Sequence, residues 1–121
     1  MTRERFLVNL TRSPEQDPDR VTVAFVMARS ALSLEKETVV LLSTDGVWAA
    51  VPAQYNVVHE SGFPPLRDLI LGFLEDGGQL WACAPCVNKR GIADQLHPDV
   101  QLVGAVTALA WVSNNGVSLS F

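Results

Sequence analysis

The chain lacks the signatures of nucleotide, nucleic-acid and membrane binding. Neither GxGxxG nor GxxxxGK[ST] occurs, and the turn after the first expected strand is not rich in glycine, so nothing supports a nucleotide cofactor. The nine basic residues are scattered among thirteen acidic ones, whereas nucleic acids and anionic membranes require a clustered basic face. Apolar runs are shorter than the roughly 18 residues of a membrane span, and the N-terminal run is shorter than the roughly 7 to 15 of a signal peptide. We therefore expect a cytoplasmic protein with no cofactor and no nucleic-acid or membrane partner.

Cysteine and histidine are also scarce, with two of each in the whole chain. A zinc site requires four ligands, usually two cysteine pairs or one pair plus two histidines a few residues apart. Cys83 and Cys86 form the single pair, and the spacing of His59 and His97 matches no zinc finger. We expect no bound metal. In a reducing cytoplasm such a pair is more often reactive than a permanent disulfide.

Apolar residues, in contrast, are plentiful. They make up 48% of the 121 residues, and charged residues make up 18%. A chain of this size can bury roughly two thirds of its unfolded surface in one core, but it is too short for a second core. We therefore expect one domain that spans residues 1–121.

Patterns typical of strands and helices alternate along the chain. Continuous or alternating apolar runs predict strands at 6–10, 38–42, 79–82, 100–103 and 117–121. Helical periodicity and capping signals predict a helix that begins at Ser13 or Asp17 and ends near Glu35. Further helices are expected at 47–51, at 64–76, from 85 onward and at 105–112, with a loop at 52–63. Such alternation predicts an α/β fold with parallel βαβ units and helices on both faces of the sheet.

The carboxyl ends of parallel strands meet at one edge of a sheet, where ligands usually bind. The residues that follow the expected strands are Thr11 and Arg12, then Ser43 to Asp45, then Cys83, then Gly104. Among them Cys83 alone is a plausible nucleophile. We therefore expect the chemistry of this protein to depend on Cys83.

The segment around the two cysteines is the most informative part of the sequence. Cys83 falls at the turn between the expected strand 79–82 and the helix that follows. The N–H groups and dipole of a helix start, with Lys89 and Arg90 one turn later, favour a thiolate there. Cys83 is therefore either a nucleophile or sulfur carrier, or a small buried hydrophobe. Cys86 is either a resolving thiol, close enough to Cys83 for a disulfide, or a core residue.

Other polar residues near the expected strand ends have two interpretations each. Asp45 either borders the site as a carboxylate or caps the short helix that follows it, and the cap is the favoured interpretation. Lys89 and Arg90 either bind an anionic sulfur species or a partner's carboxylates, or they lie on a solvated helix face. His59 either supplies an acid or base above the cysteine or is solvated. The three tryptophans are expected in the core or in a subunit interface.

The chain resembles the DsrE/DsrF-like family of small sulfur-handling proteins over nearly its whole length. The similarity depends on the order of elements, on the segment 41–47, on the helix that ends at 77–78, and on Cys83 eight positions before Gly91. It implies a three-layer α/β/α sandwich with a five-stranded, mostly parallel sheet, assembled into homotrimers or homohexamers. It also implies that Cys83 accepts a sulfane sulfur as a persulfide, as a sulfur carrier or sulfurtransferase does.

Cys86 departs from the relay proteins of this family, which carry a single cysteine in this turn, and it favours a dithiol function. Three hypotheses follow: a sulfur carrier that receives sulfur from a donor protein and passes it to a partner thiol, a dithiol redox protein that uses Cys83 and Cys86, and a non-catalytic assembly subunit. The residues expected to surround the substrate are Thr11, Thr44, Asp45, Gly46, Lys89 and Arg90.

Overall fold

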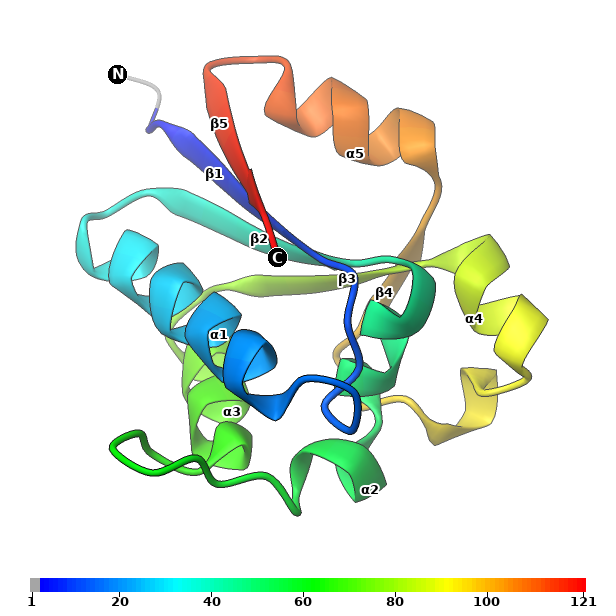
Figure 1. Cartoon of the computed structure of the whole chain (residues 1–121). Coiled ribbons are helices and arrows are strands. Elements are labelled where there is room, and N and C mark those ends of the chain that lie inside the picture. The colour runs from blue at the N-terminus through cyan, green and yellow to red at the C-terminus, as the bar shows by residue number, and fades with distance from the viewer. Residues whose placement is uncertain (1–2) are drawn as a thin grey trace.

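The computed structural model describes residues 3–121, which form a five-stranded sheet between two layers of helices (Figure 1). The strands are β1 (Arg5–Leu10), β2 (Glu37–Leu42), β3 (Gln79–Cys83), β4 (Gln101–Val103) and β5 (Gly116–Ser120). Their order across the sheet is β4-β3-β2-β1-β5, and each neighbouring pair is parallel. The predicted α/β/α sandwich is confirmed, with a sheet that is wholly rather than mostly parallel.

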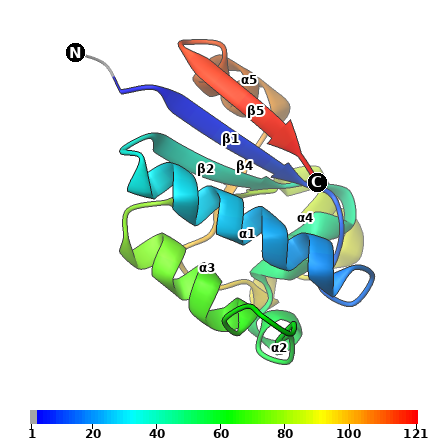
Figure 2. The same ribbon diagram turned by 60° about the vertical axis from the view of Figure 1, so that its left-hand side comes forward.

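Helices cover the two faces of the sheet unequally. The α-helices are α1 (Pro18–Ser33), α2 (Pro52–Tyr55), α3 (Leu66–Glu75), α4 (Ala84–Arg90) and α5 (Ala105–Val112), and two 3-10 segments are η1 (Thr44–Ala50) and η2 (Ala93–Gln95). Figure 2 shows α1 and α3 together on one side of the sheet and α5 on the other. In residues 3–121, no helix combines the length and the apolar character needed to cross a bilayer.

The main core lies between the sheet and the layer of α1 and α3. Phe25 of α1 and Phe73 of α3 are fully buried there, and their rings meet edge to face with centroids 6.2 Å apart. Val8 and Val40 point into the same core from the central strands. Because α1 and α3 each present an apolar stripe to the sheet, burial of these stripes fixes both helices against it.

A smaller apolar cluster lies between the sheet and α5. Trp81 of β3 is buried there, as expected for a core tryptophan, and it packs edge to face on Trp111 of α5 with centroids 5.8 Å apart. The guanidinium of Arg5 lies 5.1 Å from the centre of the Trp111 ring. The outer side of α5 remains open, since Val106 is 82% and Leu109 is 63% exposed.

Local sequence signals explain where α1 begins. The side chain of Asp17 accepts a hydrogen bond from the backbone N–H of Arg20 at 3.0 Å and caps the helix. Ser13 and Gln16 form the reciprocal side-chain to backbone bonds of a capping box, at 3.0 and 3.1 Å, in the turn before it. Both predicted start signals therefore form: the Ser13 capping box shapes the turn before the helix, and Asp17 caps the helix itself.

The segment 52–63 differs from its prediction as a loop, because Pro52–Tyr55 forms α2. Tyr55 is buried against the main core, and its backbone N–H donates to the carbonyl oxygen of Val51 at 3.1 Å. A proline at the first helical position and one anchored aromatic side chain are enough to hold a single turn.

Candidate functional site

The two cysteines lie together at the carboxyl edge of the sheet. Cys83 ends β3 and occupies the position just before α4, and Cys86 lies in the first turn of α4. Both are free, half-buried thiols, and their Sγ atoms are 2.8 Å apart. The predicted turn at Cys83 is confirmed, and the CxxC spacing brings the two sulfur atoms within reach of each other.

Cys86 is held from a second direction by the end of β2. Its Sγ atom accepts a hydrogen bond from the backbone N–H of Thr44, the first residue of η1, at 3.2 Å. The same side chain packs against the main core. Cys86 therefore combines the two features proposed for it, a core contact and a thiol next to Cys83.

The pKa of Cys83 is raised above its ordinary value, mainly because the thiol is partly buried and also because Cys86 lies beside it. The backbone N–H of Cys86 and the charge of Arg90 act in the opposite direction, but their effects are smaller. The prediction that the helix start would favour a thiolate at Cys83 is therefore wrong in its net direction. Desolvation at the sheet edge outweighs the contribution of the seven-residue helix α4.

An ion pair joins α4 to η1 next to the cysteines. Arg90 donates to Oδ1 of Asp45 from Nη2 at 2.8 Å and from Nε at 3.1 Å, and its Nη1 donates to the carbonyl oxygen of Cys86 at 3.0 Å. The hydrogen bond from Arg90, followed by one from Gln16, lowers the pKa of Asp45. The prediction of Asp45 as a helix cap is wrong, since Ser43 occupies the cap position and the Asp45 carboxylate binds Arg90 instead.

Three other predicted site residues lie where the ends of β1, β2 and β5 meet. Thr44 donates from Oγ1 to the carbonyl oxygen of Thr11 at 3.0 Å, and Thr11 donates from Oγ1 to that of Phe121 at 2.8 Å. Gly46 lies so close to β1 that an added Cβ would be 1.9 Å from the carbonyl oxygen of Leu10. The threonines and Gly46 thus position η1, while the backbone N–H of Thr44 contacts a sulfur atom directly.

Lys89 and His59 contribute less to this arrangement. Lys89 is exposed in the last turn of α4, and its charge slightly lowers the pKa of Asp45. Nε2 of His59 lies 2.9 Å from the carbonyl oxygen of Phe63 within its own loop. That loop joins α2 to α3, apart from α4 in Figure 1, so the position of His59 does not support an acid or base role above the cysteine.

A small apolar pocket opens beside Cys83 on the α5 side of the sheet. Its volume is about 150 Å³, and its walls other than Cys83 are formed by Leu41, Ser43, Val103, Gly104, Ala105 and Ala108. The Ser43 hydroxyl is bonded to Oδ1 of Asn9 at 2.9 Å. Sequence reasoning missed this pocket, although it placed Gly104 at the end of a strand, because the walls come from three strands and a helix that are distant in sequence.

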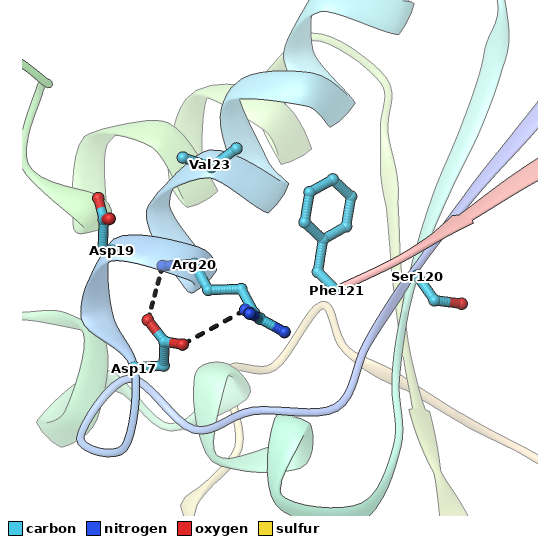
Figure 3. A pocket seen from close by; sticks show the side chains of 6 residues that line it. All are labelled: Asp17, Asp19, Arg20, Val23, Ser120 and Phe121. Carbon is cyan, nitrogen blue, oxygen red and sulfur yellow. Dashed lines mark hydrogen bonds and ion pairs between the residues drawn. The ribbon is translucent and has the colours of Figure 1, made fainter.

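A larger cavity, of about 450 Å³, lies between the start of α1 and the end of β5. Figure 3 shows its lining, where Asp17 binds Arg20 through an ion pair of 3.3 Å. Its other lining residues are Asp19, Val23, Ser120 and Phe121. None of these side chains is a thiol, so the cysteine edge remains the better candidate for nucleophilic chemistry.

Comparison with known proteins identifies the family. Residues 5–121 match the model of the DsrE/DsrF-like family. The chain belongs to the DsrE/DsrF-like family. The resemblance inferred from the cysteine segment and from the segment 41–47 is thereby confirmed.

A curated protein is similar to nearly the whole of this DsrE/DsrF-like chain. Uncharacterized protein MJ0760 of Methanocaldococcus jannaschii is 28% identical over 115 residues, which cover 94% of this chain and 41% of that protein. The chain thus spans about two fifths of the length of the curated relative it matches.

Solved structures show the same fold. The ychN protein of E. coli superposes with a TM-score of 0.73 at 15% identity, over 99% of this chain and all of that one. Protein MTH1491 of Methanobacterium thermoautotrophicum has a TM-score of 0.74 at 15% identity, over 98% of this chain and 99% of that one.

Proposed function

We propose that this DsrE/DsrF-like protein handles sulfane sulfur and that Cys83 accepts it as a persulfide. The observation that carries the proposal is a half-buried thiol at the carboxyl edge of a parallel sheet, 2.8 Å from a second thiol and open to a pocket. Family membership supports a role of the sulfur-relay type. A reducing compartment such as the cytoplasm suits this role, because it keeps both thiols available.

The uptake step is a nucleophilic displacement at sulfur. The Cys83 thiolate attacks the outer sulfur of a donor persulfide, a new S–S bond forms, and the donor leaves as a thiolate. Burial raises the pKa of Cys83, so a proton acceptor assists the attack. That proton passes to solvent, and the Cys86 thiol, 2.8 Å away, donates a hydrogen bond to the Cys83 sulfur.

Two routes discharge the persulfide. In a relay, the thiolate of an acceptor protein attacks the outer sulfur and restores the Cys83 thiol. In the dithiol route, Cys86 attacks the inner sulfur, hydrosulfide leaves, and the resulting Cys83–Cys86 disulfide is later reduced by an external dithiol. The short distance between the sulfur atoms favours this second candidate function, a dithiol redox protein.

Mass spectrometry of the intact protein tests the proposal. The protein is incubated with a persulfide donor, and the same reaction is run on Cys83→Ser and on Cys86→Ser. We expect Cys86→Ser to gain one sulfur atom that a dithiol removes, and Cys83→Ser to gain none. In the wild type, formation of a disulfide with release of sulfide indicates the dithiol route. Failure of Cys86→Ser to take up sulfur at Cys83 would contradict the proposed function.

We also propose that further copies of this chain cover the outer side of α5, in a homotrimer or homohexamer. Thr107 is the single polar residue of this helix, yet Val106 and Leu109 are largely exposed. Exposed apolar patches commonly mark protein interfaces. Light scattering is expected to give a mass of three or six chains, and a monomer of 13.2 kDa would contradict the assembly.

A further inference from the structure

The pocket beside Cys83 differs in character from the rest of the site. Its walls are aliphatic or glycine apart from Cys83 itself and Ser43, whose hydroxyl is already bonded to Asn9. The charged pair of the site, Arg90 with Asp45, connects α4 to η1, neutralises itself and does not line the pocket. A charged group that entered the pocket would lose its hydration without gaining a partner on these walls.

The volume of the pocket limits what it can hold. Its roughly 150 Å³ is similar to that of an engineered cavity with aliphatic and aromatic walls, which stays dry and binds benzene. In a displacement at sulfur, the attacking, central and leaving atoms are nearly collinear. The group carried by a sulfur donor is therefore directed away from the Cys83 sulfur, and the pocket, which Cys83 itself lines, offers space for it on the α5 side of the sheet.

We propose that this pocket binds a small, uncharged apolar group on the sulfur donor, no larger than about a benzene ring. The substrate class is thus small alkyl or aryl persulfides and disulfides rather than charged or peptide-sized donors. This inference rests on the proposed function, because it assigns a substrate class to the same cysteine.

Thiosulfonates provide a direct test, because a single reactive head can carry different groups. Cys83 forms an S–S bond with the sulfenyl sulfur, the bond to the sulfonyl group breaks, and a sulfinate leaves. Rates are measured by mass spectrometry on Cys86→Ser, in which Cys83 is the single cysteine. The reagents all transfer a methylthio group, and the sulfonyl group that leaves carries a benzyl, sulfonatoethyl or trimethylammonioethyl group. Each rate is divided by the rate at which the same reagent reacts with free N-acetylcysteine, which corrects for the intrinsic reactivity of the reagent. We expect the benzyl reagent to be favoured by about tenfold or more, as one well-placed apolar group can provide.

Two variants connect the preference to the pocket. Ala108→Leu fills the space and is expected to abolish the preference, while Ala53→Leu places the same side chain at an exposed position of α2, outside the pocket, and is expected to retain it. Val103→Ala enlarges the pocket and is expected to increase the rate with the benzyl reagent. This third variant keeps the test decisive if Ala108→Leu does not fold.

The outcomes separate this inference from the proposed function. Equal normalised rates for all reagents, together with uptake of sulfur from a persulfide donor, would overturn the pocket assignment and leave the function standing. A benzyl preference that disappears in Ala108→Leu, without any uptake of sulfur, would overturn the function and leave an apolar ligand site beside Cys83.

Discussion

Gly46→Ala is expected to destabilise the protein because η1 lies against the backbone of β1. The new Cβ would lie 1.9 Å from the carbonyl oxygen of Leu10 and 2.7 Å from its carbonyl carbon. Those atoms have little room to move, since β1 is paired on both sides, with β2 and β5, and the same oxygen accepts a hydrogen bond from the N–H of Ser43 at 3.0 Å.

The expected magnitude follows from two opposing effects. Overpacking of a well-ordered site costs about 1 to 3 kcal/mol, and so close a contact belongs at the upper end. Replacing glycine by alanine restricts the unfolded chain and recovers about 0.4 to 1 kcal/mol. We therefore expect a net loss of about 2 kcal/mol in the free energy of unfolding, which lowers Tm by about 8 °C in a domain of this size.

Urea unfolding followed by circular dichroism measures this loss, and Gly104→Ala is the matched control. Apart from its own residue and its two chain neighbours, a Cβ at Gly104 would have no atom of residues 3–121 within 4 Å, and the backbone φ there is −101°. Its cost is expected to stay below about 1 kcal/mol, because it alters only a helix cap. If Gly46→Ala and Gly104→Ala unfold at the same urea concentration, the close approach of η1 to β1 does not constrain the fold.

Two further predictions concern the charges of the site. Cys86→Ala removes a side chain that raises the pKa of Cys83. The pH at which alkylation of Cys83 by iodoacetamide is half-maximal should therefore fall, and an unchanged midpoint would refute the effect of Cys86 on this pKa. Arg90→Met should cost no more than about 1 kcal/mol at pH 7, because the partner carboxylate is partly exposed to solvent. The pKa of Asp45 is lowered from its ordinary 3.8, so the part of this loss that comes from the carboxylate should be fully present above about pH 5 and should decrease as the pH falls through the lowered pKa. The part that comes from the hydrogen bond between Arg90 and the carbonyl oxygen of Cys86 does not depend on this titration. Urea unfolding at pH 7 and pH 3 measures the loss, and an equal loss at both values contradicts a role for the carboxylate.

The order of elements could be predicted from the sequence because its signals are local. Apolar runs, helical stripes and proline or glycine boundaries each lie within one segment, and the helix expected at 105–112 has the observed bounds. The turn of α2 could not be predicted in the same way. Its stability depends on burial of Tyr55 against residues far away in the chain, while its composition is typical of a loop.

The place of Cys83 in the fold could be predicted from the sequence, but the electrostatics around it could not. A strand followed at once by a helix was enough to place Cys83 at the sheet edge. The direction of its pKa depends on burial by other strands and by α5, and the partner of Asp45 lies 45 residues away at Arg90. Contacts between distant segments of this kind leave no periodic signal in the sequence.

The position of the sulfur pair across the sheet edge has a kinetic consequence. Cys83 borders the pocket under α5, whereas Cys86 packs toward the core on the opposite face and meets η1. A reagent seated in the pocket under α5 therefore meets the Cys83 sulfur directly, while the Cys86 sulfur is contacted by Thr44 and by the main core. Small apolar reagents are therefore expected to label Cys83 before Cys86, and the order of labelling sets which sulfur controls the rate.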